Sequence, residues 1–217
     1  MPIFLDLDNT LVDRDAAFAL WAERAMPAWG GRADDVAWLI HADDGGYAAR
    51  SQLAQTIIER LQPVATDVDA LVASMRTGLL EHLECYPGVL DQVERLQAMG
   101  QSVVVVTNGD PDQQRRKLDK TGLSRVITRA VISGELGFKK PDPRIFEAAL
   151  ALSTDDGVAW MVGDHVTADI AGARALGWST AWVGHGREWP EQWAPTVTAR
   201  EPAETLALVR RSIQDAR

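Results

Sequence analysis

The sequence predicts an α/β protein with a parallel sheet, flanking helices and a helical subdomain inserted after the first strand. Short apolar runs alternate with helical patterns over most of the chain, which is typical of parallel strands joined by right-handed crossovers. The segment from about Asp13 to Glu84 breaks this alternation, because it shows only helical patterns. The chain has 217 residues, and at about 150 residues per domain this leaves room for one core and a smaller insert.

Five strands are expected, and the second is the clearest. Ser102–Val106 is rich in β-branched residues and contains no charge, as in a strand that is buried on both faces. The other four expected strands are Ile3–Leu7, Ala130–Ile132, Val158–Val162 and Ser179–Val183. The helices expected between them are Val89–Met99, Asp112–Lys120, Arg144–Leu152 and Ala168–Leu176. Together they predict a Rossmann-like core.

Helix-end signals support these assignments. Asp110 and Asp142 each precede a proline, which is the arrangement of a capping acid before the first helical position. Gly100 and Gly177 lie where the helices before the second and last strands should end.

The inserted segment is expected to be all-helical. Apolar residues recur near a 3.6-residue spacing in Asp15–Met26, Tyr47–Leu61 and Val68–Leu83. We therefore predict an α/β core at 1–12 and 86–217, and a helical subdomain at 13–85.

Composition limits the possible partners. The formal net charge of −9 argues against a nucleic-acid-binding protein, which needs a basic face, although a local site for an anion remains possible. The single cysteine, Cys85, fits a reducing compartment. An acid appears at position six, and no apolar run approaches the roughly 20 residues that span a bilayer. We expect a cytoplasmic protein without membrane contact.

Reactive side chains follow the expected strands, at the sheet edge where open α/β sheets bind their ligands. The first strand ends in Asp6-Leu7-Asp8-Asn9-Thr10 and the second in Thr107-Asn108-Gly109. Lys139-Lys140-Pro141-Asp142 precedes a later helix, and the fourth strand ends in Gly163-Asp164, with Asp169 beyond it.

The acids predict a magnesium site. Asp6 and Asp8 would point the same way on a straight strand, and Asp164 would join them if the first and fourth strands are neighbours. Together with Asp169 and Lys140, these carboxylates carry a formal charge of about −3, and a divalent cation reduces it to about −1. Mg²⁺ suits such oxygen ligands and a phosphate.

A phosphoryl group has expected ligands as well. Thr107 and Asn108 end a strand and precede a helix, where a hydroxyl and free backbone N–H groups bind phosphate. Lys140 adds a positive charge for the phosphoryl oxygens.

These four motifs, in this order, resemble the haloacid dehalogenase superfamily of hydrolases, and the resemblance covers Ile3 to about Val183. It implies a helical cap of the family's first class at the insert. It also implies that Asp6 is a nucleophile that forms an aspartyl-phosphate and that Asp8 is the general acid and base, with a backbone carbonyl on the metal. Thr107 and Lys140 would hold the phosphoryl group, Asp164 would bind Mg²⁺, and Asp169 would bind or orient it.

The expected function is therefore Mg²⁺-dependent hydrolysis of a small phosphorylated metabolite. A haloacid dehalogenase needs neither the metal nor the second acid, a phosphomutase would differ mainly in its cap, and a silent binding protein should lack a key residue. Nucleotide monophosphates, sugar phosphates and phosphoglycolate stay open as substrates, and the oligomeric state is not predicted. The residues of the insert that are candidates for facing the site are Arg14, His41, Asp43, Asp44 and Arg50.

Overall fold

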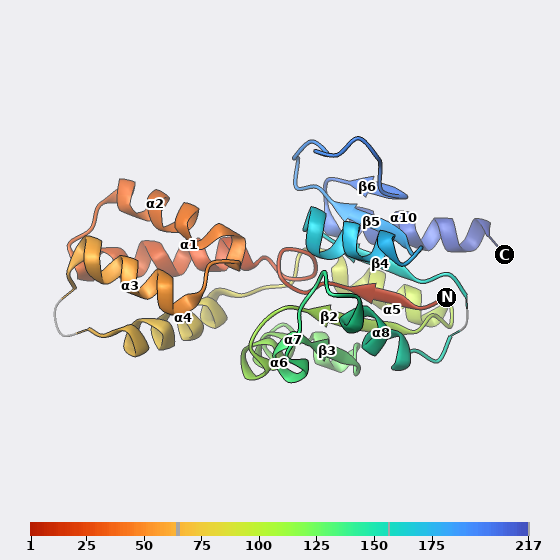
Figure 1. Cartoon of the computed structure of the whole chain (residues 1–217), viewed down its shortest axis with the longest axis horizontal. Helices are drawn as coiled ribbons and strands as arrows, with labels where there is room; N and C mark the ends of the chain where they lie inside the picture. Colours follow the sequence, from red (N-terminus) through yellow and green to blue (C-terminus); the bar gives the residue numbers. More distant parts are fainter. Residues whose placement is uncertain (64–65, 156, 217) are drawn as a thin grey trace. The chain divides into compact units, whose positions relative to one another are not determined.

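A six-stranded parallel sheet forms the centre of the larger of two units into which the chain divides (Figure 1). The computed structural model describes residues 1–63, 66–155 and 157–216. The larger unit comprises Met1–Val12 and Cys85–Arg217, and the smaller one comprises Asp13–Glu84.

The sheet has the strand order β3-β2-β1-β4-β5-β6, and every neighbouring pair is parallel. The strands are β1 (Ile3–Leu5), β2 (Val103–Thr107), β3 (Ala130–Ile132), β4 (Trp160–Gly163), β5 (Ser179–Val183) and β6 (Val197–Ala199). The chain builds outward from β1 through β2 to β3, and then returns to the other side of β1 for β4. This reversal creates a switch point between β1 and β4, where such sheets bind ligands beyond the carboxyl ends of their strands.

Helices cover both faces of the sheet. They are α5 (Val89–Ala98), α6 (Pro111–Lys120), α7 (Ser133–Leu136), α8 (Pro143–Ala151), α9 (Gly172–Ala175) and α10 (Pro202–Asp215). Phe4, Val104 and Met161 pack with Phe146 of α8 and Ala173 of α9 in one buried cluster. The chain segments of α5 and α10 contact each other, and α10 also contacts β5 and β6.

The smaller unit consists of helices, and its described residues contain no strand. The helices are α1 (Arg14–Ala25), α2 (Ala33–Asp43), α3 (Arg50–Leu61) and α4 (Val68–His82), with short 3-10 turns at Met26–Trp29 and Asp44–Gly46. Helix α1 packs against α2 and α4, and α3 packs against α4. Phe18, Trp21, Leu39, Ile57 and Met75 are buried in this unit.

The predicted fold class is confirmed, and the helix-end signals operate as expected. The carboxylates of Asp110 and Asp142 accept hydrogen bonds from the first turns of α6 and α8. Gly100 and Gly177 have φ angles of 77° and 74°, in the left-handed region that favours glycine.

Several boundaries differ from the prediction. Strand β4 begins at Trp160 rather than Val158, which is exposed. The helix predicted at Ala168–Leu176 is instead a π-helical turn, η4 (Val166–Ala171), followed by the short α9. Strand β6 and helices α2, α7 and α10 were not predicted. Strand β6 reads Val-Thr-Ala with an exposed threonine in its centre, so it contains no apolar run from which a buried strand could be recognised.

No helix in the described part of the chain has the length and apolar character needed to cross a membrane.

Candidate active site

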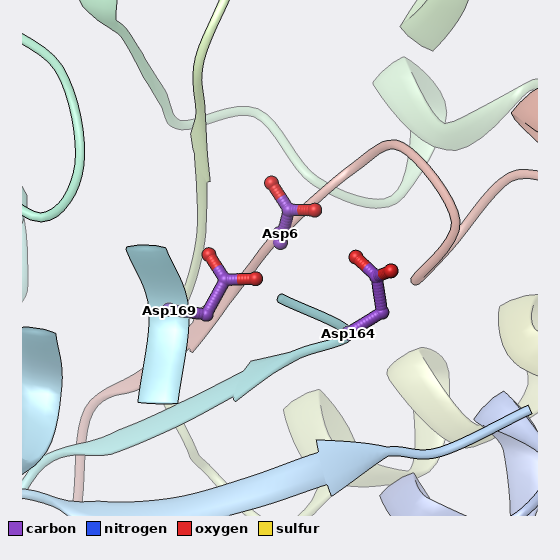
Figure 2. A group of neighbouring side chains, drawn as sticks. All are labelled: Asp6, Asp164 and Asp169. Atoms are coloured by element: carbon purple, nitrogen blue, oxygen red, sulfur yellow. The ribbon is translucent and has the colours of Figure 1, made fainter. Parts of the chain in front are cut away.

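Three carboxylates meet at the switch point of the sheet (Figure 2). Asp6 directly follows β1, Asp164 directly follows β4, and Asp169 lies on η4. Since Leu5 pairs with Val162 across the two strands, the residues that come next leave the sheet side by side. One carboxylate oxygen from each acid lies within 4.8 Å of those of the other two. We call Asp6, Asp164 and Asp169 the acidic cluster.

Asp169 depends on the glycine that ends β4. A Cβ atom at Gly163 would lie 2.3 Å from the Oδ2 atom of Asp169, so only glycine leaves space for this carboxylate. The backbone N–H of His165 donates to the same Oδ2 atom at 3.0 Å. The ring Nδ1 of His165 accepts from the backbone of Thr167 and Ala168. His165 therefore caps η4 and orients Asp169. Single π-helical turns such as η4 are frequent at functional sites.

Lys140 is a buried cation beside this cluster. Its Nζ lies 2.6 Å from Asp6 Oδ1, 2.7 Å from Asp169 Oδ1 and 2.6 Å from the carbonyl oxygen of Val106. The Asn108 side chain holds the lysine's backbone, because its Oδ1 accepts from the Lys140 N–H and its Nδ2 donates to the Lys140 carbonyl. The amide of Asn108 thus fixes the lysine loop, and a phosphate-binding role for this residue stays a prediction.

The charges in this site oppose one another strongly. Burial, together with Asp169 and Asp8, raises the pKa of Asp6 to about 7 despite the opposing effect of Lys140. Burial also raises the pKa of Asp164 well above its ordinary value, with contributions from Asp169 and Asp6. Burial alone would lower the pKa of Lys140, but the two neighbouring carboxylates outweigh it and raise that pKa. Three carboxylates face a single ammonium group here, and when all three are ionised their charge exceeds that of Lys140, which favours a bound cation.

The side chain of Asp8 lies apart from the acidic cluster. Its Oδ1 and Oδ2 atoms lie 2.7 and 2.6 Å from Nζ of Lys117, and its Oδ2 also accepts from Nε2 of Gln114 at 3.0 Å. Strand β1 ends at Leu5, so the straight-strand geometry expected for Asp6 and Asp8 does not extend to position eight. The role of Asp8 as a metal ligand stays a prediction for its backbone carbonyl.

Thr107 ends β2 as expected, and its hydroxyl accepts a hydrogen bond of 2.6 Å from Gln114. Sequence reasoning missed Gln114 and Lys117, although their spacing of three places them on one face of the helix that follows the Thr-Asn-Gly motif. That spacing was the available signal.

Arg187 is another residue that the sequence did not reveal. Its guanidinium donates to the backbone carbonyl of Asp164 at 2.9 Å and lies 3.4 Å from the Asp164 carboxylate. The indole of Trp182 donates to the same carbonyl at 2.8 Å. These contacts fix the backbone at the end of β4, but Arg187 lies in an irregular loop that carries no recognisable pattern.

The candidate residues of the smaller unit fall into two groups. Arg14 and Arg50 both donate to the carboxylate of Asp43, and Arg14 and Asp43 are almost fully buried. These three residues tie α1 to the end of α2 and the start of α3. His41 and Asp44 are exposed.

The fold and the site together define an α/β protein with an acidic cluster at the carboxyl edge of a parallel sheet. A family model described as haloacid dehalogenase-like hydrolase matches residues 3–177, so the chain belongs to this family.

Several curated relatives are phosphatases. The chain is 31% identical over 186 residues to "Phosphoserine phosphatase" of Thermus thermophilus, covering 81% of the chain and 66% of the relative. It is 33% identical to "Glyceraldehyde 3-phosphate phosphatase" of Pyrococcus abyssi, with 55% and 51% covered. It is 39% identical to "Pyrimidine 5'-nucleotidase YjjG" of Escherichia coli, with 48% of each covered. The chain thus spans about half to two thirds of the length of these relatives.

Solved structures share the fold. The hydrolase YfnB of Bacillus subtilis, bound to magnesium, has a TM-score of 0.76 at 24% identity, with 96% of this chain and 98% of that chain covered. A β-phosphoglucomutase homologue from Thermotoga maritima has a TM-score of 0.78 at 16% identity, with 97% and 99% covered.

Proposed function

We propose that this protein is a Mg²⁺-dependent phosphatase that hydrolyses a small phosphomonoester through an aspartyl-phosphate on Asp6. The observation that carries the proposal is the buried contact of Asp6 with Lys140 inside the acidic cluster. A carboxylate nucleophile beside a fixed cation is suited to phosphoryl transfer, which depends mainly on positioning and on charge stabilisation.

The acidic cluster fits a magnesium ion. Its three carboxylates offer hard oxygen ligands close together, and Lys140 is the cation that the structure places in contact with two of them. Asp6, Asp164 and Asp169 would hold the ion with the backbone carbonyl of Asp8, and the ion would supply charge neutralisation for the phosphoryl oxygens.

The residues of this chain then have defined roles. A carboxylate oxygen of Asp6 attacks phosphorus, the bond from phosphorus to the leaving oxygen breaks, and protonated Asp8 gives its proton to that oxygen. A water molecule next attacks phosphorus and loses its proton to Asp8. This attack breaks the bond between phosphorus and the Asp6 oxygen and releases inorganic phosphate. Lys140 and Thr107 would hold the phosphoryl oxygens through both steps.

The relatives support a small phosphorylated metabolite as substrate, since their names specify phosphoserine, glyceraldehyde 3-phosphate and pyrimidine nucleotides. A cap role for the helical unit Asp13–Glu84 is part of the same proposal, as is a cytoplasmic location.

The test begins with the turnover of p-nitrophenyl phosphate in Mg²⁺ and in EDTA after exhaustive dialysis. We expect activity only with the metal, no turnover by Asp6→Asn, and a phosphoryl group on Asp6 after a rapid acid quench. Mg²⁺ should also raise the thermal midpoint of the wild type. Full activity in EDTA would remove the metal from the proposal, and label on another residue would remove the covalent step.

Two further assays address the alternatives on the same fold. Relatives include "(S)-2-haloacid dehalogenase 4A" of Burkholderia cepacia, at 27% identity over 117 residues. Release of halide from 2-chloropropionate would favour that chemistry, and interconversion of hexose phosphates without release of phosphate would favour a mutase. A protein inactive in all these assays would match the silent binding protein.

A further inference from the structure

Two buried polar side chains of α6 converge on a single carboxylate. Gln114 and Lys117 lie three positions apart, so they share one helix face, and both are almost fully buried. Lys117 Nζ contacts both oxygens of Asp8, at 2.7 and 2.6 Å, and Gln114 Nε2 donates to one of them at 3.0 Å. Residues of the helix that follows β2 thereby hold the Asp8 carboxylate in place.

Gln114 also joins this arrangement to the expected phosphoryl ligand. The same Nε2 atom lies 2.6 Å from the hydroxyl of Thr107 and 3.4 Å from the carbonyl oxygen of Asn108. A Cβ atom at Gly109 would lie only 3.0 Å from the amide carbon of Gln114. The glycine of the Thr-Asn-Gly motif therefore gives the Gln114 side chain its place between Thr107 and Asp8.

A lysine as buried as Lys117 is unusual, because lysine side chains mostly reach water. Removal of an ammonium group from water is unfavourable unless a charged partner compensates for it, and the Asp8 carboxylate is such a partner. A general acid and base works efficiently only when its oxygen is held near the reacting proton. Lys117 and Gln114 both contact the Asp8 carboxylate from a helix, and a helix positions such contacts more accurately than a loop does.

We propose that Lys117, assisted by Gln114, is the positioning residue that holds the Asp8 carboxylate for both proton transfers of the phosphatase reaction. This inference rests on the proposed function, because it assigns a partner to the acid and base of that reaction. The two buried lysines then have separate roles, since Lys140 serves the nucleophile and Lys117 serves the proton carrier.

The first test compares leaving groups. Nitrophenolate leaves without help, whereas an alkoxide needs the proton from Asp8, so loss of positioning should affect alkyl phosphates more. In Lys117→Met, we expect kcat/KM for an alkyl phosphate to fall at least about tenfold further than for p-nitrophenyl phosphate, within the range of general acid–base effects. Inhibition by inorganic phosphate should change less than about threefold. Lys117→Arg should restore most of the alkyl-to-aryl ratio.

Two variants accompany this comparison. Lys120→Met, on the same helix at an exposed position, is the matched control and should keep the wild-type ratio. Gln114→Leu removes the second donor to Asp8 and should shift the ratio in the same direction as Lys117→Met. If Lys117→Met fails to fold, Gln114→Leu and Lys117→Arg carry the test. An alkyl-to-aryl ratio that stays at the wild-type value in the folded variants would overturn the inference.

The second test is a double-mutant cycle with Asp8→Asn. If Lys117 acts through Asp8, then Lys117→Met should change the rate less than about twofold in the Asp8→Asn background. An equal loss of rate in the wild-type and Asp8→Asn backgrounds would mean a structural role for Lys117. That result would overturn this inference and leave the proposed function in place. Absence of Mg²⁺-dependent phosphatase activity in the wild type would instead overturn the proposed function, and this inference with it.

Discussion

Replacing Asp6 with asparagine should stabilise the metal-free protein, and the gain should grow with pH. Asp6 is buried, lies near two other carboxylates, and has its pKa raised from 3.8 to about 7. Asparagine has nearly the same shape and is neutral at every pH. Lys140 keeps a carboxylate partner in the variant, because Asp169 lies 2.7 Å from its Nζ.

The sign and size of the effect follow from the raised pKa. Between about pH 4 and pH 7 the folded wild type retains a proton on Asp6 that the unfolded chain has lost, so its free energy of unfolding falls as the pH rises. A shift of about three units, at about 1.4 kcal/mol per unit, corresponds to about 4 kcal/mol. The advantage of Asp6→Asn should therefore rise from near zero at pH 4 to about 4 kcal/mol at pH 7, and then level off. For a chain of this size that is roughly 8–16 °C in the thermal midpoint.

The assay is thermal unfolding of both proteins in EDTA at half-unit steps from pH 4 to pH 8. Subtracting the two curves removes the contributions of groups that titrate equally in both proteins. Glu94→Gln, an exposed carboxylate on α5, is the matched control and should show no such trend. A difference between Asp6→Asn and the wild type that is the same at pH 4 and pH 7 would refute the reasoning, as would a wild type that is the more stable protein at pH 7.

Other substitutions probe the surroundings of Asp6. Gly163→Ala would place a methyl group against Asp169, so we expect the free energy of unfolding in urea titrations to fall by about 1–3 kcal/mol. Calorimetry should show weaker metal binding, and an unchanged metal affinity would contradict this expectation. Lys140→Met would leave buried carboxylates without their cation, so we expect the free energy of unfolding to fall by about 3–5 kcal/mol at pH 8. The fall should be smaller at pH 5, where Asp6 is protonated, and an equal fall at both pH values would contradict this expectation. Burial raises the pKa of the Cys85 thiol, so alkylation by iodoacetamide at pH 8 should be much slower in the folded than in the urea-unfolded protein, and equal rates would contradict this.

The sequence predicted those parts of the molecule that depend on local signals. The β-branched run before Thr107 and the apolar residues before Asp6 are enough to define strands, and the acids that follow them must lie at the carboxyl edge of a parallel sheet. Asp164 could meet Asp6 only if β1 and β4 were neighbours in the sheet, and the two strands do pair in parallel.

Other parts could not be predicted, because long side chains find partners that are far apart in the sequence. Lys117 and Asp8 are 109 positions apart, and a lysine on an amphipathic helix is normally expected to reach solvent. Arg14 and Asp43 were candidates for facing the substrate, yet they are buried against each other. The burial of such a pair follows from the packing of whole helices, which a residue pattern does not specify.

The partner of Asp8 changes the charge balance of the site. The sequence-based count set four carboxylates against Lys140 and gave about −3 without a metal. Because Lys117 pairs with Asp8 at both oxygens, Asp8 leaves that count, and the acidic cluster with Lys140 has a formal charge of about −2 when its three acids are ionised. A single divalent cation then brings the cluster close to neutral, so a phosphate dianion meets no net repulsion there. The acid and base has a counter-ion of its own, so removing the metal should disturb the nucleophile while leaving the contact between Asp8 and Lys117 in place.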